Sequence, residues 1–301
     1  MKKVSVLGSL NMDLVTRVHK TPVVGETVLG EGFVQIPGGK GANQAATIGR
    51  LGGNVSMIGR VGEDEFGKQL MESLNHDHVD TKYVLKSKSA PTGTALIMVN
   101  ESGDNSIVVI PGANFELSTQ DVSEQILEGD YLVAQLEVPL EIIEKSFEMA
   151  KQKGITTVLN PAPAKALSPS ILRHVDILIP NETEFKLLTG CDPKNEDMLD
   201  QGVSDLIALG TKKILITLGE RGAVLCDGVT KTYFKAQKVA PVDTTAAGDS
   251  FIGGLLFALS KGESLDRSIN FGTLVAAITV TRAGAQSSLP TWAEVVEKFG
   301  V

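Results

Sequence analysis

The 301-residue sequence predicts an α/β fold in which a mainly parallel sheet carries a small β-sheet lid. From residue 131 onward, short apolar runs alternate with segments of helical periodicity, which is the pattern of βαβ units. Two segments rich in Val, Thr and Gly, residues 14–36 and 95–110, instead alternate as short strands do. We therefore expect one domain over residues 1–301, with the lid formed by about residues 14–37 and 92–112.

The composition and charge favour a protein that acts on a small ligand. The formal net charge is −8 without a Lys/Arg cluster, which argues against nucleic acid or an anionic membrane as a partner. Cys191 and Cys226 lack the spacing of a metal site or a disulfide framework, so we expect reduced thiols and a cytoplasmic location. The apolar run that begins at Val4 is interrupted by Asn11 and Asp13, and no uncharged run reaches the length of a membrane span.

The first expected element is a buried strand, because residues 4–7 form a β-branched run that ends at Gly8. Asn11 and Asp13 follow its carboxyl end, which is the side of an open parallel sheet where ligands bind. Their amide and carboxylate suit vicinal hydroxyls, and an Asx turn explains the pair equally well.

A glycine-rich segment, residues 38–46, leads into a helix that ends near Gly52. Its glycines allow a ligand to approach the backbone, and Lys40 and Asn43 supply donors at the helix start, although tight packing is the commoner reason for such glycines. Residues 62–69 resemble a phosphate-binding P-loop, but glutamine stands where Ser or Thr must hold Mg²⁺ and acidic side chains stand where phosphate would lie. We reject that interpretation.

Turn signals define two hairpins. Residues 101–104 join two strands within the second lid segment, and Asp227 with Gly228 joins strands at 223–226 and 230–235. Residues 265–281 then read as a long apolar helix.

The apolar runs after residue 131 each end in a polar group. Because the carboxyl ends of parallel strands meet at one edge of a sheet, these groups are expected to share that edge. They are Glu137, Asn160, Asn181 and the segment 219–222. Asn181 also begins a helix in which Glu184 either caps the helix or holds a hydrated Mg²⁺, and the local sequence favours the cap.

Residues 243–254 form a small-residue turn that runs into an apolar helix. Free amides at a helix start suit an anion, and the small side chains of Ala246, Ala247 and Gly248 let a phosphate approach them. Asp249 places a carboxylate beside that site, which makes sense if it takes a proton during phosphoryl transfer to a hydroxyl. From this segment alone, a helix cap with close packing is as good an explanation.

Taken together, the motifs resemble the ribokinase-like (PfkB) carbohydrate kinases over nearly the whole chain. Residues 38–46 resemble the N-terminal signature of the family and residues 243–254 its C-terminal signature. The segments 160–164, 181–184 and 217–222 stand in the family's order. The resemblance implies a three-layer, doubly wound, mainly parallel sheet with a small β-sheet lid.

The resemblance also implies the roles of individual residues. Asp249 would be the catalytic base, and the amides of Ala246, Ala247 and Gly248 the anion hole. The sugar-binding residues, which match the ribose-phosphorylating members, would be Asn11, Asp13, Gly39, Lys40, Asn43, Glu137 and Asp249. ATP would contact Asn181, Thr217, Gly219, Glu220, Arg221, Gly222, Gly248 and Thr273, the last of which is aligned through a helix without a sharp motif.

Two ions and a partner subunit follow from the same resemblance. Mg²⁺ would bridge the ATP phosphates, held through water near Glu184. K⁺ would bind mostly to carbonyls of two loops, at Asp243, Thr245, Thr279, Arg282, Gly284 and Ser288. The lid would pair two subunits into a homodimer. Ser250 and Ile252 stand where the family more often has Thr and Asn, which bears on fine-tuning of the ligands and leaves the chemistry intact.

The expected reaction is transfer of the γ-phosphoryl group of ATP to the 5-hydroxyl of D-ribose, giving ribose 5-phosphate and ADP. The alternatives are a related kinase of fructose, a nucleoside such as adenosine, or a keto-deoxy acid, and a catalytically silent sugar-binding protein. The absence of G-x-G-x-x-G after the first strand and of G-x-S-x-G weakens dehydrogenase and hydrolase interpretations.

Overall fold

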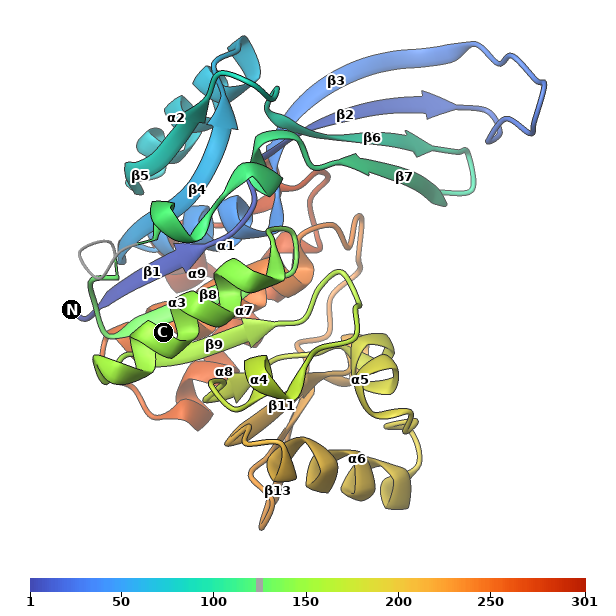
Figure 1. The fold of residues 1–301 in the computed structure, drawn as a ribbon. Coiled ribbons are helices and arrows are strands. Elements are labelled where there is room, and N and C mark those ends of the chain that lie inside the picture. Colours follow the sequence, from blue (N-terminus) through green and yellow to red (C-terminus); the bar gives the residue numbers. More distant parts are fainter. Residues whose placement is uncertain (123–126) are drawn as a thin grey trace.

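The computed structural model describes residues 1–122 and 127–301, which fold around two sheets. The larger sheet has nine strands in the order β13-β12-β11-β10-β9-β8-β1-β4-β5, and Figure 1 shows it running through the middle of the molecule. All pairs from β11 to β5 are parallel, while β12 and β13 add an antiparallel hairpin. The strands are β1 (Lys3–Leu7), β4 (Asn54–Gly62), β5 (Asp80–Ser87), β8 (Tyr131–Gln135), β9 (Thr156–Asn160), β10 (Ile177–Leu178), β11 (Lys213–Thr217), β12 (Ala223–Cys226) and β13 (Lys231–Phe234).

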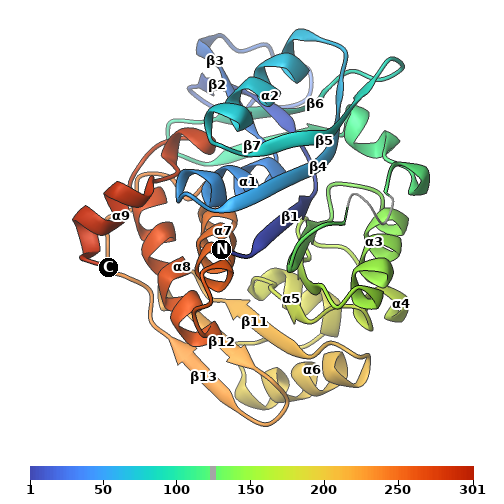
Figure 2. The same cartoon turned by 90° about the vertical axis from the view of Figure 1, so that its left-hand side faces the viewer.

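Helices cover both faces of this sheet, which confirms the predicted three-layer α/β fold (Figure 2). On one face lie α1 (Lys40–Arg50), α2 (Glu65–His76), α7 (Ala247–Ser260) and α8 (Leu265–Thr279), with α9 (Trp292–Phe299) packed outside α8. On the other face lie α3 (Leu140–Gln152), α4 (Pro169–Leu172), α5 (Glu182–Thr189) and α6 (Glu196–Ala208). Each face buries its own apolar cluster, because strands covered on both sides are apolar on both sides.

A separate four-stranded sheet projects from one edge of the molecule, as Figure 1 shows. Its order is β3-β2-β6-β7, from β2 (Asn11–Val18), β3 (Gly30–Gly38), β6 (Gly93–Val99) and β7 (Asn105–Ile110). The outer pairs, β2 with β3 and β6 with β7, are antiparallel, and the second pair is the hairpin predicted at residues 101–104. The sheet as a whole is not antiparallel, however, because β2 and β6 pair in parallel. Both strands leave the main sheet from the same edge, so they run outward side by side.

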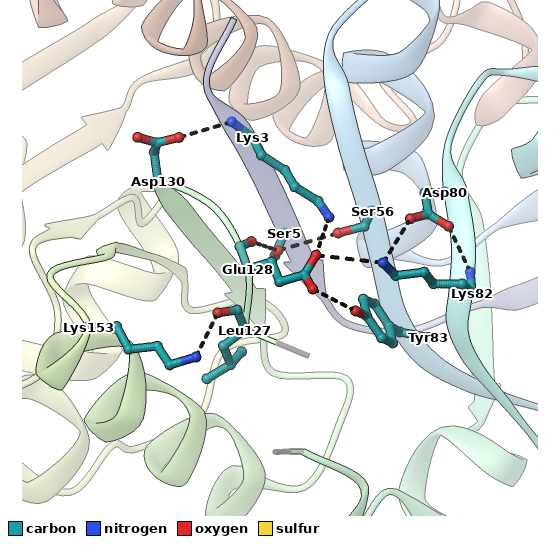
Figure 3. Close-up of polar contacts among 10 residues, drawn as sticks. All are labelled: Lys3, Ser5, Ser56, Asp80, Lys82, Tyr83, Leu127, Glu128, Asp130 and Lys153. Atoms are coloured by element: carbon teal, nitrogen blue, oxygen red, sulfur yellow. Dashed lines mark hydrogen bonds and ion pairs between the residues drawn. The ribbon is translucent and has the colours of Figure 1, made fainter. Parts of the chain in front are cut away.

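The amino-terminal edge of the parallel strands is closed by charged and polar side chains (Figure 3). Glu128, just before β8, accepts hydrogen bonds from Lys3 Nζ at 3.0 Å and from Tyr83 Oη at 3.2 Å. The Glu128 carboxylate also lies 3.6 Å from Lys82 Nζ, and its backbone carbonyl accepts from Ser5 Oγ at 2.7 Å. These contacts tie β1, β5 and the segment before β8 together, at the opposite edge from the projecting sheet.

Short 3₁₀ turns complete the described structure: η1 (Gly112–Glu116), η2 (Thr119–Asp121), η3 (Gly219–Arg221) and η4 (Gln286–Ser288). Within the described ranges, no helix combines the length and apolar character that crossing a bilayer requires. Cys226 is buried, Cys191 is partly buried, and both are free thiols.

Candidate active site

The predicted site residues gather at the carboxyl edge of the main sheet. The chain order reverses at β1, which is flanked by β4 on one side and β8 on the other. In open parallel sheets the crevice outside such a reversal is where ligands bind. The four-stranded sheet rises from this same edge (Figure 1).

The start of α7 leaves backbone donors without acceptors. Ala246, the N-cap residue, has a left-handed conformation with φ of 58°. Within residues 1–122 and 127–301, the amides of Ala246, Gly248 and Asp249 donate to no acceptor, whereas Ala247 N donates to Thr244 O at 3.2 Å. A Cβ on Gly248 would have open space around it. Free amides at the positive end of a 14-residue helix, with room beside them, form a place for an anion.

The carboxylate of Asp249 lies in the first turn of α7 and is held by α1. Its Oδ2 accepts a hydrogen bond from Asn43 Nδ2 at 3.0 Å, and its Oδ1 accepts one from Gln44 Nε2 at 3.1 Å. Asp249 is only 7% exposed, so these two amides fix the direction in which the carboxylate faces. Each carboxylate oxygen keeps lone-pair capacity for a proton.

Gln44 and Gln135 are part of this arrangement, and the sequence reasoning missed them. Gln135, at the end of β8, donates from Nε2 to Gln44 Oε1 at 2.7 Å, and both side chains are fully buried. A signal was present for each: Gln44 follows Asn43 in the glycine-rich segment, and Gln135 is an amide inside an otherwise apolar strand. A buried amide needs polar partners, so its position in the strand marks a polar interior.

Three further charged groups meet beside Asp249. Glu137 Oε2 accepts from Lys40 N at 3.2 Å and from Ser9 Oγ at 2.5 Å. Burial, with repulsion from Glu137 and Asp249, raises the pKa of Asp13 to about 7 despite the opposing effect of Lys40. Burial by itself lowers the pKa of Lys40, but the surrounding carboxylates outweigh it and raise that pKa above its ordinary value. The site is thus crowded with acidic groups around one buried ammonium.

The glycines before α1 are required by this crowding. A Cβ on Gly38 would lie 2.3 Å from Asp13 Oδ2, and one on Gly39 would lie 2.7 Å from Asn11 N. Gly39 also has φ of 90°, which other residues rarely adopt. Tight packing, the alternative explanation for these glycines, therefore does occur here. It brings the start of α1 close to the Asp13 carboxylate.

A cavity of about 190 Å³ opens beside these groups, between the projecting sheet and the ends of β8 and β9. Its lining combines polar and apolar side chains, namely Asn11, Val109, Pro111, Asn114, Phe115, Leu136, Glu137, Pro163 and Lys165. Asn114 was not predicted, because it reaches the cavity from η1 and no motif marks it. The seven predicted sugar-binding residues thus lie on the wall of this cavity or in the charged cluster next to it.

The residues predicted to contact a nucleotide lie further along the same edge. Asn181 and Thr217 form an isolated parallel bridge at the ends of β10 and β11. The Asn181–Glu184 motif is a helix cap, as the local sequence favoured: Asn181 Oδ1 accepts from Glu184 N, and the Glu184 carboxylate accepts from Asn181 N at 2.8 Å and Nδ2 at 3.0 Å. Burial raises the pKa of Glu184, partly offset by its bond to Asn181 and by Lys40.

The loop after β11 is shaped by glycine. Gly222 has φ of 96°, and a Cβ there would lie 1.9 Å from Phe234 O. Glu220 and Arg221 are exposed in η3, where Arg221 Nη2 is 2.6 Å from Glu182 Oε1. Thr273 is buried in α8, and its hydroxyl donates to Asn270 O at 2.7 Å.

The two loops predicted to bind K⁺ are joined by Asp243. Its Oδ1 accepts from Thr245 N and its Oδ2 from Gly284 N, both at 2.8 Å. The backbone amides of residues 242 and 243 also donate to Val280 O.

The other residues predicted at the K⁺ site have partners within the protein. Thr279 and Ser288 are fully buried with their hydroxyls bonded to nearby carbonyls. Arg282 binds Glu294 at 2.6 Å, which contributes most to lowering the pKa of Glu294 to about 2. Among the described residues, no group of three or more His, Cys, Asp or Glu is placed to hold a metal ion.

Comparisons with known proteins agree with this geometry. The profile of the pfkB family carbohydrate kinases matches residues 1–292. A ribokinase of Staphylococcus aureus is 41% identical over 298 residues, covering 97% of this chain and 98% of that protein. A deoxyribokinase of Salmonella typhi is 36% identical over 300 residues, covering 98% of this chain and 97% of that protein. The solved structure of an Arabidopsis thaliana ribokinase complexed with ribose and ATP superimposes with a TM-score of 0.92 at 31% identity, covering 98% of both chains.

Proposed function

The chain belongs to the pfkB family of carbohydrate kinases, and from this premise we propose that it transfers the γ-phosphoryl group of ATP to the 5-hydroxyl of D-ribose. The products are ribose 5-phosphate and ADP. The observation that carries the proposal is the buried Asp249 carboxylate, oriented by Asn43 and Gln44, beside free amides at the start of α7.

The chemistry follows from that pairing. As the ribose hydroxyl oxygen forms its bond to the γ-phosphorus, its proton passes to the Asp249 carboxylate, and the bond from the γ-phosphorus to the bridging oxygen of ADP breaks. The free amides of Ala246, Gly248 and Asp249 can stabilise the negative charge of the transferring group. The amide of Ala247 contributes less, because it already donates to Thr244 O.

The acidic cluster and the cavity support a polyhydroxylated substrate. Asp13 and Glu137 supply acceptors, while Lys40 and the side-chain amides of Asn11 and Asn43 supply donors. Buried donors and acceptors of this kind penalise a ligand whose hydroxyls do not match them. A free pentose that satisfies them binds better than a ligand that leaves one unpaired.

For the nucleotide we propose the edge formed by Asn181, Thr217 and residues 219–222, because Glu184, three residues after Asn181, is close enough to Asp249 for the two carboxylates to repel each other. Gly219 and Gly222 both have positive φ, and Gly222 lets this loop lie close to β13. We also propose nucleotide contacts for Glu220, Arg221 and Thr273. To reach the nucleotide, Arg221 must first break its ion pair with Glu182, and the Thr273 hydroxyl must release the carbonyl of Asn270.

The ions fit the residues that would hold them. Both oxygens of Glu184 already accept hydrogen bonds from Asn181, so Mg²⁺ would be held near it through water, as this ion prefers. Asp243 fastens the loop of Thr245 to the loop of Gly284, and such loops offer the backbone carbonyls that suit K⁺. When bound, Mg²⁺ would neutralise charge on the ATP phosphates, and K⁺ would stabilise the loop before α7.

The four-stranded sheet is proposed as a lid over the sugar and as the surface that pairs two subunits. Asp13 lies on β2, and Val109 of β7 lines the cavity, so closing of this sheet would cover the sugar. Exposed apolar residues further out on the same sheet support a dimer.

The decisive test of the base is Asp249→Asn. We expect turnover to fall by at least about a thousandfold, because the hydroxyl loses its proton acceptor while the side chain keeps its size. The KM for ATP should change little. ADP release from ribose and ATP is the measurement, and near-normal turnover in this variant would remove Asp249 from its role.

The substrate and K⁺ are tested together in a sugar panel. ADP release is measured with ribose, 2-deoxyribose, fructose and adenosine, each with K⁺ and then with Na⁺ or a bulky organic cation. We expect ribose to have the highest kcat/KM, with turnover highest in K⁺. The similarity to a deoxyribokinase makes 2-deoxyribose the informative competitor. Equal turnover in every cation would contradict the proposed K⁺ site.

A further inference from the structure

Asn114 joins separate segments at the base of the four-stranded sheet. It lies in η1 and is 1% exposed. Its Oδ1 accepts from Leu10 N at 2.9 Å, and its Nδ2 lies 2.8 Å from Asn11 Oδ1, 3.0 Å from Pro111 O and 3.1 Å from Leu10 O. Leu10 and Asn11 lead from β1 into β2, whereas Pro111 follows β7. The Asn114 side chain therefore connects the segment that enters the four-stranded sheet at β2 with the segment that leaves it after β7.

The backbone partners determine the orientation of both amides. The Leu10 N–H can only donate and the carbonyls of Leu10 and Pro111 can only accept, so Asn114 must place Oδ1 toward the former and Nδ2 toward the latter. The Asn11 atom that meets Asn114 Nδ2 must then be the acceptor Oδ1. Asn11 Nδ2 is left over, and in the described parts of the chain nothing accepts a hydrogen bond from it.

The two amides pack closely against the backbone of Gly93. A Cβ on Gly93 would lie 2.2 Å from both Asn11 Oδ1 and Asn114 Nδ2. The neighbouring Thr92 is held separately, because Asp64 accepts from its backbone amide at 2.7 Å and from its hydroxyl at 2.6 Å. The attachment of β6 is thus fixed to the start of α2, and Asn114 sits in the small space that remains.

We propose that Asn114 is a positioning residue that turns the Asn11 amide so that Nδ2 faces the cavity as a donor to the substrate. The proposal rests on the proposed sugar phosphorylation. Asn11 and Asn114 both line the cavity beside Glu137, so the donor that Asn114 leaves free lies at its wall. The ligand atom it fits is an acceptor oxygen of the sugar. Asn114 itself has no donor left to offer, because its two N–H groups already face three acceptors.

The experiment is a double-mutant cycle with Asn114→Ala and Asn11→Ala, read as KM for ribose and KM for ATP. Each single variant should raise the ribose KM about tenfold, the value of one well-placed hydrogen bond, while the ATP KM stays within about twofold. The double variant should be no worse than Asn11→Ala alone, because Asn114 acts on the sugar through Asn11. Thr157→Val is the matched control: it removes the hydroxyl of a buried β9 residue, which donates to His174 O at 2.5 Å and also bonds to Asp176, and it should leave the ribose KM unchanged.

A second variant keeps the test informative if Asn114→Ala is unstable. Asn114→Asp keeps the size and the acceptor for Leu10 N, but in its ionised form its other oxygen faces Asn11 Oδ1 and the carbonyls of Leu10 and Pro111. Of these three acceptors only the Asn11 amide can rotate, so it turns its Nδ2 toward the carboxylate and away from the cavity. This variant should raise the ribose KM at least as much as Asn114→Ala. Unchanged ribose KM in the Asn114 variants, or multiplied effects in the double variant, would overturn the positioning role. Lack of ribose-dependent ADP release by the wild-type protein would instead overturn the proposed function, and the role of Asn114 with it.

Discussion

The carboxyl group of Asp13 makes the site sensitive to pH near neutrality. Its pKa is raised from 3.8 to about 7, mainly by burial and then by Glu137 and Asp249. Between these two values the folded protein holds a proton that the unfolded chain has released, so the free energy of unfolding falls as the pH rises through this window and levels off above about 7. Ionisation of Asp13 in the ligand-free protein therefore lowers the free energy of unfolding.

Asp13→Asn should remove that cost. We expect the variant to gain thermal stability relative to wild type as the pH rises from about 4 to 7, and the difference in Tm to be constant above that range. In the wild type, the ribose KM should also rise as the pH falls below about 7, because ionised Asp13 accepts from sugar hydroxyls. Parallel melting curves of both proteins across this range are the measurement. A Tm difference that does not change with pH would contradict the prediction.

The sequence singled out several residues that the structure brings together at one edge of the sheet, but not all of the side chains that orient them. The glycines and small residues of two segments indicate a ligand-binding site, and these segments contain Asp249, Asn43 and Lys40. Gln135 and Asn114 lie in an apolar strand and a short 3₁₀ turn, and their roles come from contacts 91 and 104 residues away in the chain. No local pattern encodes such contacts, because tertiary packing brings the partners together.

Among the elements, the loop from β11 to β12 depends on Gly222. Gly222→Ala would combine an unfavourable φ of 96° with a Cβ 1.9 Å from Phe234 O. We expect a loss of about 3 kcal/mol or more of unfolding free energy and a raised ATP KM, since η3 must move away from β13. Gly228→Ala is the matched control, because its φ is 85° but its nearest contact is 3.6 Å away. It should cost about 1 kcal/mol and leave the ATP KM unchanged. Denaturant unfolding and ATP kinetics compare the two, and equal effects would contradict the steric argument.

The elements themselves were largely predictable, whereas their pairing was less so. The hairpins at residues 101–104 and 227–228 and the helices after residues 38 and 246 follow from turn residues and periodicity, which are local. The parallel pairing of β2 with β6 was not predicted, because it joins segments about 80 residues apart. The alternation of each strand fits an antiparallel or a parallel neighbour equally well.

For the whole molecule, the register of the four-stranded sheet sets two rows of side chains on one face. The row Ile36, Asp13, Ala95 and Val109 lies two residues out from Asn11, which begins β2, and Val109 lines the cavity. Two residues further out along the strands, the row Val34, Val15, Ile97 and Ile107 faces the same way, since side chains alternate along a strand. Val34 is 55% and Ile107 51% exposed, so an apolar strip extends beyond the part of the sheet that covers the site. A second copy of the chain would cover it.

We therefore expect the protein to be a dimer in solution and the double variant Val34→Lys/Ile107→Lys to be a monomer, because two charges in one row oppose burial of that face. The ribose KM should rise in the monomer, since the sheet that carries Asp13 loses its support, while the ATP KM should change little. Light scattering after size-exclusion chromatography measures the mass, and Val229→Lys, at a 92% exposed turn next to β13, is the control that should stay dimeric. A monomeric wild-type protein, or a double variant that remains a dimer, would show that this strip is not the subunit interface.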